Sequence, residues 1–99
     1  PSEYPSISRD LSFQISGESN IKKLVDLIMK FDDEILKESF ILDWYHDKKN
    51  HKIKLGFRFI FQSYDKTLTD QEVDKVINDI VESTLTFDDI KIPGYINKK

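Results

Sequence analysis

The chain has 99 residues, 38% of them hydrophobic and 33% charged, which suits a single globular domain. It has no cysteine, so disulfides, thiolate metal sites and cysteine nucleophiles are excluded. The net charge of −3 argues on its own against a nucleic-acid partner. The sequence shows no signal-peptide pattern and no apolar run of the roughly 18–20 residues that span a membrane, so we expect a cytoplasmic protein without a membrane partner.

The first predicted elements are a strand and a helix. Residues 9–16 alternate apolar and polar side chains, as in a strand with one wet face. Residues 17–20 have turn composition, and Ser19 or Asn20 can cap the helix that follows. Apolar residues then recur at helical spacing, at Ile21, Leu24, Val25, Ile28 and Phe31. The pattern predicts a helix that ends near the acidic run 32–34.

Two further strands are predicted over residues 36–45 and 53–62, joined by a polar hairpin loop. In the first, the more apolar set is expected to face the core; it comprises Leu36, Phe40, Leu42 and Trp44. In the second, the core set comprises Leu55, Phe57, Phe59 and Phe61.

A second helix begins at a capping box, in which Thr69 and Glu72 can satisfy each other's backbone amides. Leu68 and Val73 are placed as a hydrophobic staple, and the stripe continues through Val76, Ile77, Ile80 and Val81. A short last strand is expected over residues 90–92. We therefore expect a domain over residues 1–94 and a mobile tail over residues 95–99.

The predicted order is βαββαβ, which is typical of the ferredoxin-like α+β fold, a four-stranded antiparallel sheet with two helices on one face. Strand phase predicts which residues lie on the other face. They are Asp10, Ser12, Gln14, Ile41, Asp43, Tyr45, Gly56, Arg58 and Ile60.

Charge is distributed unevenly along the chain. Residues 46–66 hold six basic and two acidic residues, whereas residues 69–89 hold one basic and seven acidic residues. If the two segments fold onto different faces, the domain has one basic side; two solvated surfaces are the alternative.

Candidates for catalysis are few. The three glycines are isolated, at Gly17, Gly56 and Gly94, so no phosphate-binding loop is present. His46 and His51 flank one loop with Asp47 nearby, but a polar loop explains them better than a metal site. We therefore expect no catalytic residue and no metal ligand in this chain.

The sheet face away from the helices offers groups that suit single-stranded RNA. Tyr45 can stack on a base, Asp43 and Ser12 can bond a base edge, and Arg58 can contact phosphate. The alternative is that Tyr45 only covers the sheet while Arg58 pairs with Asp10 or Asp43.

Several stretches resemble the motifs of one family. Residues 5–13, PSISRDLSF, resemble its opening P-x-x-x-R-D-L-A/S, and residues 42–45, LDWY, resemble its F/L-D-x-Y. A longer block of the family is matched by residues 55–63 (LGFRFIFQS) and residues 66–73 (KTLTDQEV). In that block Arg is usual at the positions that Gln62 and Lys66 occupy here. The family is the ferredoxin-fold anticodon-binding domain at the C-terminus of phenylalanyl-tRNA synthetase, and the likeness is strongest to the bacterial β subunit.

The resemblance implies that the chain is a fragment of a longer ligase and grips the anticodon stem-loop of phenylalanine tRNA. Tyr45 would stack on a base, Asp43 would accept hydrogen bonds, and Ser12 would lie beside them. Backbone attraction would come from the basic residues Arg9, Arg58, Lys48, Lys49 and Lys54. ATP and magnesium would serve the parent enzyme's catalytic module, and its catalytic subunit and other domains would be partners.

Two other functions remain open. A ferredoxin-like domain can be a small-molecule regulatory module that dimerises around an effector. It can also be an acylphosphatase-like enzyme, which needs a phosphate-holding loop after the first strand; here that loop is Ser16-Gly17-Glu18-Ser19, with an acid and one glycine.

Overall fold

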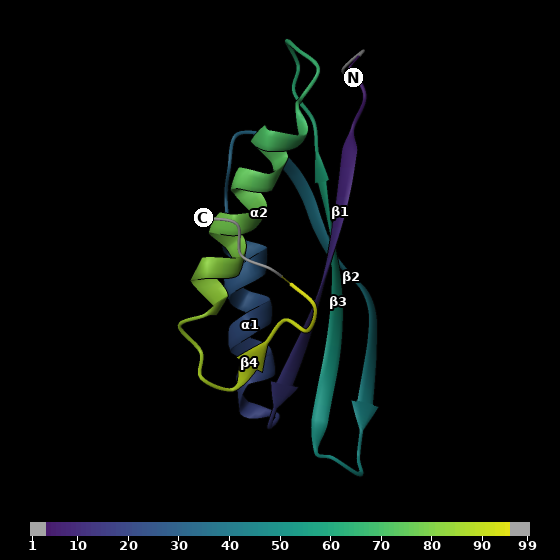
Figure 1. Cartoon of the computed structure of the whole chain (residues 1–99), viewed down its shortest axis with the longest axis vertical. Helices are drawn as coiled ribbons and strands as arrows, with labels where there is room; N and C mark the ends of the chain where they lie inside the picture. The colour runs from purple at the N-terminus through teal and green to yellow at the C-terminus, as the bar shows by residue number, and fades with distance from the viewer. Residues whose placement is uncertain (1–3, 96–99) are drawn as a thin grey trace.

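The order of elements along the chain is βαββαβ, in a computed structural model that describes residues 4–95. The elements are β1 (Ile7–Ser16), α1 (Ser19–Lys30), β2 (Leu36–Asp47), β3 (Lys52–Phe61), α2 (Asp70–Thr84) and β4 (Ile90–Lys91). The strands form one antiparallel sheet in the order β2-β3-β1-β4. Both helices lie on one side of the long strands (Figure 1). The predicted ferredoxin-like α+β fold is confirmed.

The core lies between the helices and the sheet. Strands β1 and β3 contribute Phe13, Phe57, Phe59 and Phe61, all fully buried. The Phe13 and Phe57 rings meet edge to face, with centroids 5.7 Å apart. Each helix closes the core with its apolar stripe, as in Leu24 and Ile28 of α1. The predicted core face of β3 is confirmed.

Helix α2 begins as predicted. Glu72 N donates to Thr69 Oγ1 at 3.2 Å, and Thr69 N donates to Glu72 Oε1 at 3.1 Å, which completes the capping box. Leu68 and Val73 are both buried, as the staple requires.

The start of α1 differs from the expectation that Ser19 or Asn20 caps it. Both residues lie inside the helix, and the cap position is Glu18, whose side chain makes no capping bond. Gly17, with φ +93°, turns the chain sharply after β1, so the helix begins at once. The Asn20 amide instead donates to Asp89 Oδ2 at 2.9 Å and ties α1 to the loop before β4.

Strand β2 also differs, because its register with β3 shifts between Leu36 and Glu38 and again between Ile41 and Asp43. The first shift reverses the predicted faces of residues 38–41, and the second shift restores them from Asp43 onward. Phe40 lies opposite Arg58 and shares its face, whereas Ile41 lies opposite Phe57 on the helix side. The predictions for Phe40 and Ile41 are therefore wrong.

Trp44 lies opposite Leu55, on the predicted side of the sheet, yet 66% of its surface is exposed. Leu42, in the irregular stretch, is also exposed. The expectation that both are buried is wrong, because β2 is the outermost strand and its helix-side face is not fully covered.

Tyr95, the first residue of the predicted tail, packs against the core, and its hydroxyl donates to Asn78 Oδ1. Residues 96–99, the rest of that tail, lie outside the described residues. Within residues 4–95, neither helix is long and apolar enough to cross a membrane.

Candidate nucleic-acid interface

The sheet face away from the helices, which we call the open face, carries side chains in rows across β1, β3 and β2. Residues directly opposite each other in paired antiparallel strands point to the same side, so the register fixes each row. The three central rows are Gln14–Lys54–Tyr45, Ser12–Gly56–Asp43 and Asp10–Arg58–Phe40. The face therefore holds Ser12, Asp43 and Tyr45 together, although they come from strands far apart in sequence.

Tyr45 presents the largest aromatic surface on the open face. Its side chain is 63% exposed, and Lys54 lies directly opposite it on β3. An exposed ring beside a cation suits a nucleotide, because the base can stack while the ammonium meets the phosphate.

Asp43 lies in the next row, directly over Gly56. A Cβ atom added to Gly56 would lie 2.4 Å from Asp43 Oδ1, so the carboxylate occupies the space that a side chain there would need. Within residues 4–95 the Asp43 carboxylate accepts no hydrogen bond and forms no ion pair. Its acceptors are therefore available to a base edge, with Ser12 in the same row.

Arg58 occupies the third row and is already paired. Its Nε donates to Asp10 Oδ1 at 2.9 Å and its Nη2 donates to Asp10 Oδ2 at 3.0 Å. The hydrogen bond from Arg58 holds the pKa of the Asp10 carboxyl below its usual value. A phosphate contact by Arg58 would share the guanidinium with Asp10.

Arg9 is not on the open face. It lies opposite Phe59 on the helix side, and its Nη2 donates to Asp70 Oδ1 at 3.0 Å at the start of α2. The structure thus places Arg9 apart from Ser12, Asp43 and Tyr45, joining β1 to α2.

The β2–β3 hairpin turn carries exposed lysines at Lys48 and Lys49. Asp47 organises the turn by accepting from Asn50 N at 3.2 Å and from Asn50 Nδ2 at 2.8 Å. The Asn50 side-chain hydrogen bond, followed by backbone hydrogen bonding, lowers the pKa of Asp47. The turn therefore presents cations just beyond Tyr45, at the same end of the sheet.

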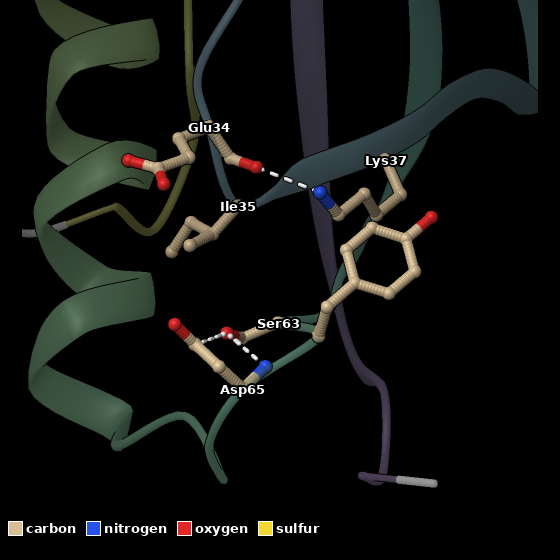
Figure 2. Close-up of a pocket in the computed structure, with 6 residues that line it drawn as sticks. Glu34, Ile35, Lys37, Ser63 and Asp65 are labelled. Carbon is tan, nitrogen blue, oxygen red and sulfur yellow. Dashed lines mark hydrogen bonds between the residues drawn. The ribbon is translucent and has the colours of Figure 1, made fainter. Parts of the chain in front are cut away.

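Residues 4–95 contain no group of three or more histidine, cysteine or acidic side chains that could hold a metal ion. A small pocket lies at the opposite end of the β2–β3 pair from the hairpin turn. In it Lys37 Nζ donates to the Glu34 carbonyl at 2.8 Å, and Ser63 Oγ donates to Asp65 Oδ1 at 2.7 Å. Figure 2 shows both hydrogen bonds as dashed lines. None of the residues that line this pocket belongs to the three central rows of the open face.

The close approach of Asp43 to Gly56 is the open-face feature that the sequence patterns did not predict. A lone glycine inside a strand pattern is a signal of close approach by another group. That signal was present in the sequence, but the approaching group, Asp43, becomes visible only once β2 and β3 are in register.

Comparison with known proteins identifies the family of the chain. Residues 2–87 match the family model described as the ferredoxin-fold anticodon binding domain. The chain is 43% identical over 75 residues to the chloroplastic phenylalanine–tRNA ligase beta subunit of Pyropia yezoensis, covering 74% of this chain and 10% of that protein.

Two further relatives carry the same name. The chloroplastic beta subunit of Porphyra purpurea is 35% identical over 86 residues, covering 85% of this chain and 12% of its own length. The beta subunit of Sulfurimonas denitrificans is 32% identical over 83 residues, covering 83% of this chain and 11% of its own length. The chain thus spans about a tenth of these relatives, and it belongs to the ferredoxin-fold anticodon binding domain family.

Proposed function

We propose that this chain binds the anticodon stem-loop of phenylalanine tRNA on its open face, as one domain of a phenylalanine–tRNA ligase beta subunit. The observation that carries the proposal is the placement of Tyr45, Asp43 and Ser12 in adjacent rows of an uncovered sheet face. Stacking on an exposed ring and hydrogen bonding at a base edge are how single-stranded loops are read.

In this proposal Tyr45 stacks on one base and Asp43 accepts hydrogen bonds from a base edge, with Ser12 beside it. Lys54 and the turn lysines Lys48 and Lys49 attract the phosphate backbone at the same end of the sheet. Arg58 contributes charge while it remains paired with Asp10. Arg9, on the other side, is proposed to reach the backbone outside the open face.

The proposed parent enzyme joins phenylalanine to this tRNA at the expense of ATP, with its catalytic subunit and other domains as partners. We propose that ATP and magnesium serve the catalytic module of the parent enzyme and not this chain. We propose that the parent enzyme works in the cytoplasm. Two of the three relatives named above are chloroplastic, which makes the chloroplast the alternative location. Imaging of the tagged full-length protein decides between the two locations.

The test is binding of transcribed phenylalanine tRNA to the 99-residue chain, compared with a transcript that differs only in its anticodon. Specific recognition predicts weaker binding of the altered transcript at every salt concentration, because base contacts rather than phosphate contacts have been removed. Equal binding of both transcripts would contradict anticodon recognition and leave only a general attraction for RNA.

A further inference from the structure

Phe40 adds an aromatic ring to the open face, two rows away from Tyr45. The register shift before Glu38 turns Phe40 away from the helices, so it lies opposite Arg58 rather than in the core. Its side chain is half-buried, and within residues 4–95 it is not one of the apolar side chains that pack against the core. Core packing therefore does not explain an aromatic ring at this position.

The row that holds Phe40 repeats the arrangement of the row that holds Tyr45. In the first row, Tyr45 of β2 lies opposite Lys54 of β3. In the third row, Phe40 of β2 lies opposite Arg58 of β3, whose guanidinium is held by two hydrogen bonds to Asp10. A ring beside a cation suits a nucleotide, because the base can stack on the ring while the cation meets the phosphate. Two of the central rows thus offer the same pair of groups.

The separation of the two rings allows each of them to take a different base. Their rows are four residues apart along β3, which is about 14 Å. Stacked bases are about 3.4 Å apart, so bases on both rings are splayed rather than stacked on each other, as in the single-stranded loops that proteins read. The row between them holds Asp43 and Ser12, which can bond the edge of an intervening base.

We propose that Phe40 is a second base-stacking residue, which takes a base of the tRNA loop different from the one that Tyr45 takes. This inference rests on the proposed function, because it places the anticodon loop on the open face. The loop runs along β2 from one ring to the other, with one base over each of the three central rows. If Phe40 only covered the sheet, another apolar side chain of similar size would serve as well.

The variants separate base stacking from covering the sheet. Phe40→Leu keeps an apolar side chain but removes the flat ring, whereas Phe40→Tyr keeps the ring. Tyr45→Leu removes the other ring. Ile60→Leu is the matched control, because Ile60 is a half-buried apolar residue of the open face in the row beyond Arg58.

The experiment measures aminoacylation by the phenylalanine–tRNA ligase proposed to carry this chain. The substrates are the intact transcript and a set of transcripts that each lack one base, either in the anticodon or at the nucleotide on one side of it. A side chain that contacts a given base adds nothing on the transcript that lacks this base, so its substitution lowers kcat/KM on the other transcripts only. Amino-acid activation without tRNA and the thermal midpoint are recorded for each variant.

On the intact transcript, Phe40→Leu should lower kcat/KM for tRNA by about five- to tenfold, the lower part of the range for losing a base stacked on a ring. This loss should disappear on one abasic transcript and persist on the others. The loss from Tyr45→Leu should disappear on a different transcript, whose missing base lies two nucleotides away. Phe40→Tyr and Ile60→Leu should match the wild type, as should activation and the thermal midpoints of all variants.

A wild-type kcat/KM for Phe40→Leu beside an impaired Tyr45→Leu would overturn the inference and leave the proposed function intact. An equal loss from Phe40→Leu on every transcript would also overturn it, as would a loss that disappears only with the base that Tyr45 contacts. If the effects of Phe40→Leu and Tyr45→Leu both depend on no base of the loop, the proposed function itself fails.

Discussion

Tyr45 and Trp44 are neighbours on β2 that present rings of nearly equal exposure, 63% and 66%, to opposite sides of the sheet. Tyr45 shares its face with Asp43 and Lys54, whereas Trp44 shares its face with the core residue Leu55. Two exposed aromatic rings one residue apart thus differ in the groups around them. Trp44→Ala is therefore a natural control for Tyr45→Ala.

Truncation of the core phenylalanines should destabilise the domain strongly. Phe57 and Phe59 are fully buried, and removing a buried ring costs about 3–5 kcal/mol. Urea unfolding of Phe57→Ala and Phe59→Ala measures this loss. Trp44→Ala, at an exposed position, should lower the free energy of unfolding by less than about 1 kcal/mol. Near-wild-type stability of Phe57→Ala and Phe59→Ala would contradict the assigned core.

The capping box should contribute a modest, local stabilisation. Thr69→Ala removes the acceptor for Glu72 N and should lower the free energy of unfolding by about 1 kcal/mol. Thr67→Ala, two residues earlier and exposed, is the matched control and should be nearly neutral. Equal stability of the two variants by thermal melting would show that the Thr69 bond adds nothing.

The Asp10–Arg58 pair should make stability depend on pH in the acid range. The hydrogen bond from Arg58 lowers the pKa of Asp10 in the folded state below 3.8, so its stabilising effect is complete above that value. The effect is then lost as the pH falls through the folded pKa. We expect the small stability gap between the wild type and Asp10→Asn to close below about pH 4. A gap that stays constant from pH 7 to the acid end would show that the pair is not its source.

The outline of the fold was predictable because its signals are local. The capping box at Thr69 and the alternation of Phe57 and Phe59 each depend on a few adjacent residues. Counting alternate residues failed at Phe40 and Ile41, because a register shift inserts one residue into the alternation and leaves no mark in composition. It correctly placed Asp43 and Tyr45, because the second register shift, between Ile41 and Asp43, restores the alternation.

The pairings of the basic residues were less predictable than the strands. The pairing of Arg58 with Asp10 is one of the alternatives that the sequence suggests, and it is present in the structure. The contact of Arg9 with Asp70, by contrast, joins residues 61 positions apart. Contacts of this kind depend on how a helix docks on the sheet, which strand patterns do not specify.

Lysines of the hairpin turn should act through charge alone. Lys48→Gln and Lys49→Gln should each weaken tRNA binding modestly, with a loss that shrinks as salt rises. Removing one phosphate contact lowers the slope of log affinity against log salt by about 0.7 for a single strand. Titrations at several salt concentrations measure the slope, and a loss that persists at high salt would indicate a base contact instead.

The most direct test of the proposed function is aminoacylation by the Tyr45→Ala variant of the phenylalanine–tRNA ligase proposed to carry this chain. Base stacking on an aromatic ring is worth about 1–3 kcal/mol, so kcat/KM for tRNA should fall by about five- to a hundredfold. Tyr45→Phe should keep most of the activity, and Trp44→Ala should keep nearly all of it. Amino-acid activation measured by ATP–pyrophosphate exchange should be unchanged in all three. If Tyr45→Ala charges tRNA with the wild-type kcat/KM, Tyr45 only covers the sheet and the open face is not the anticodon-binding surface.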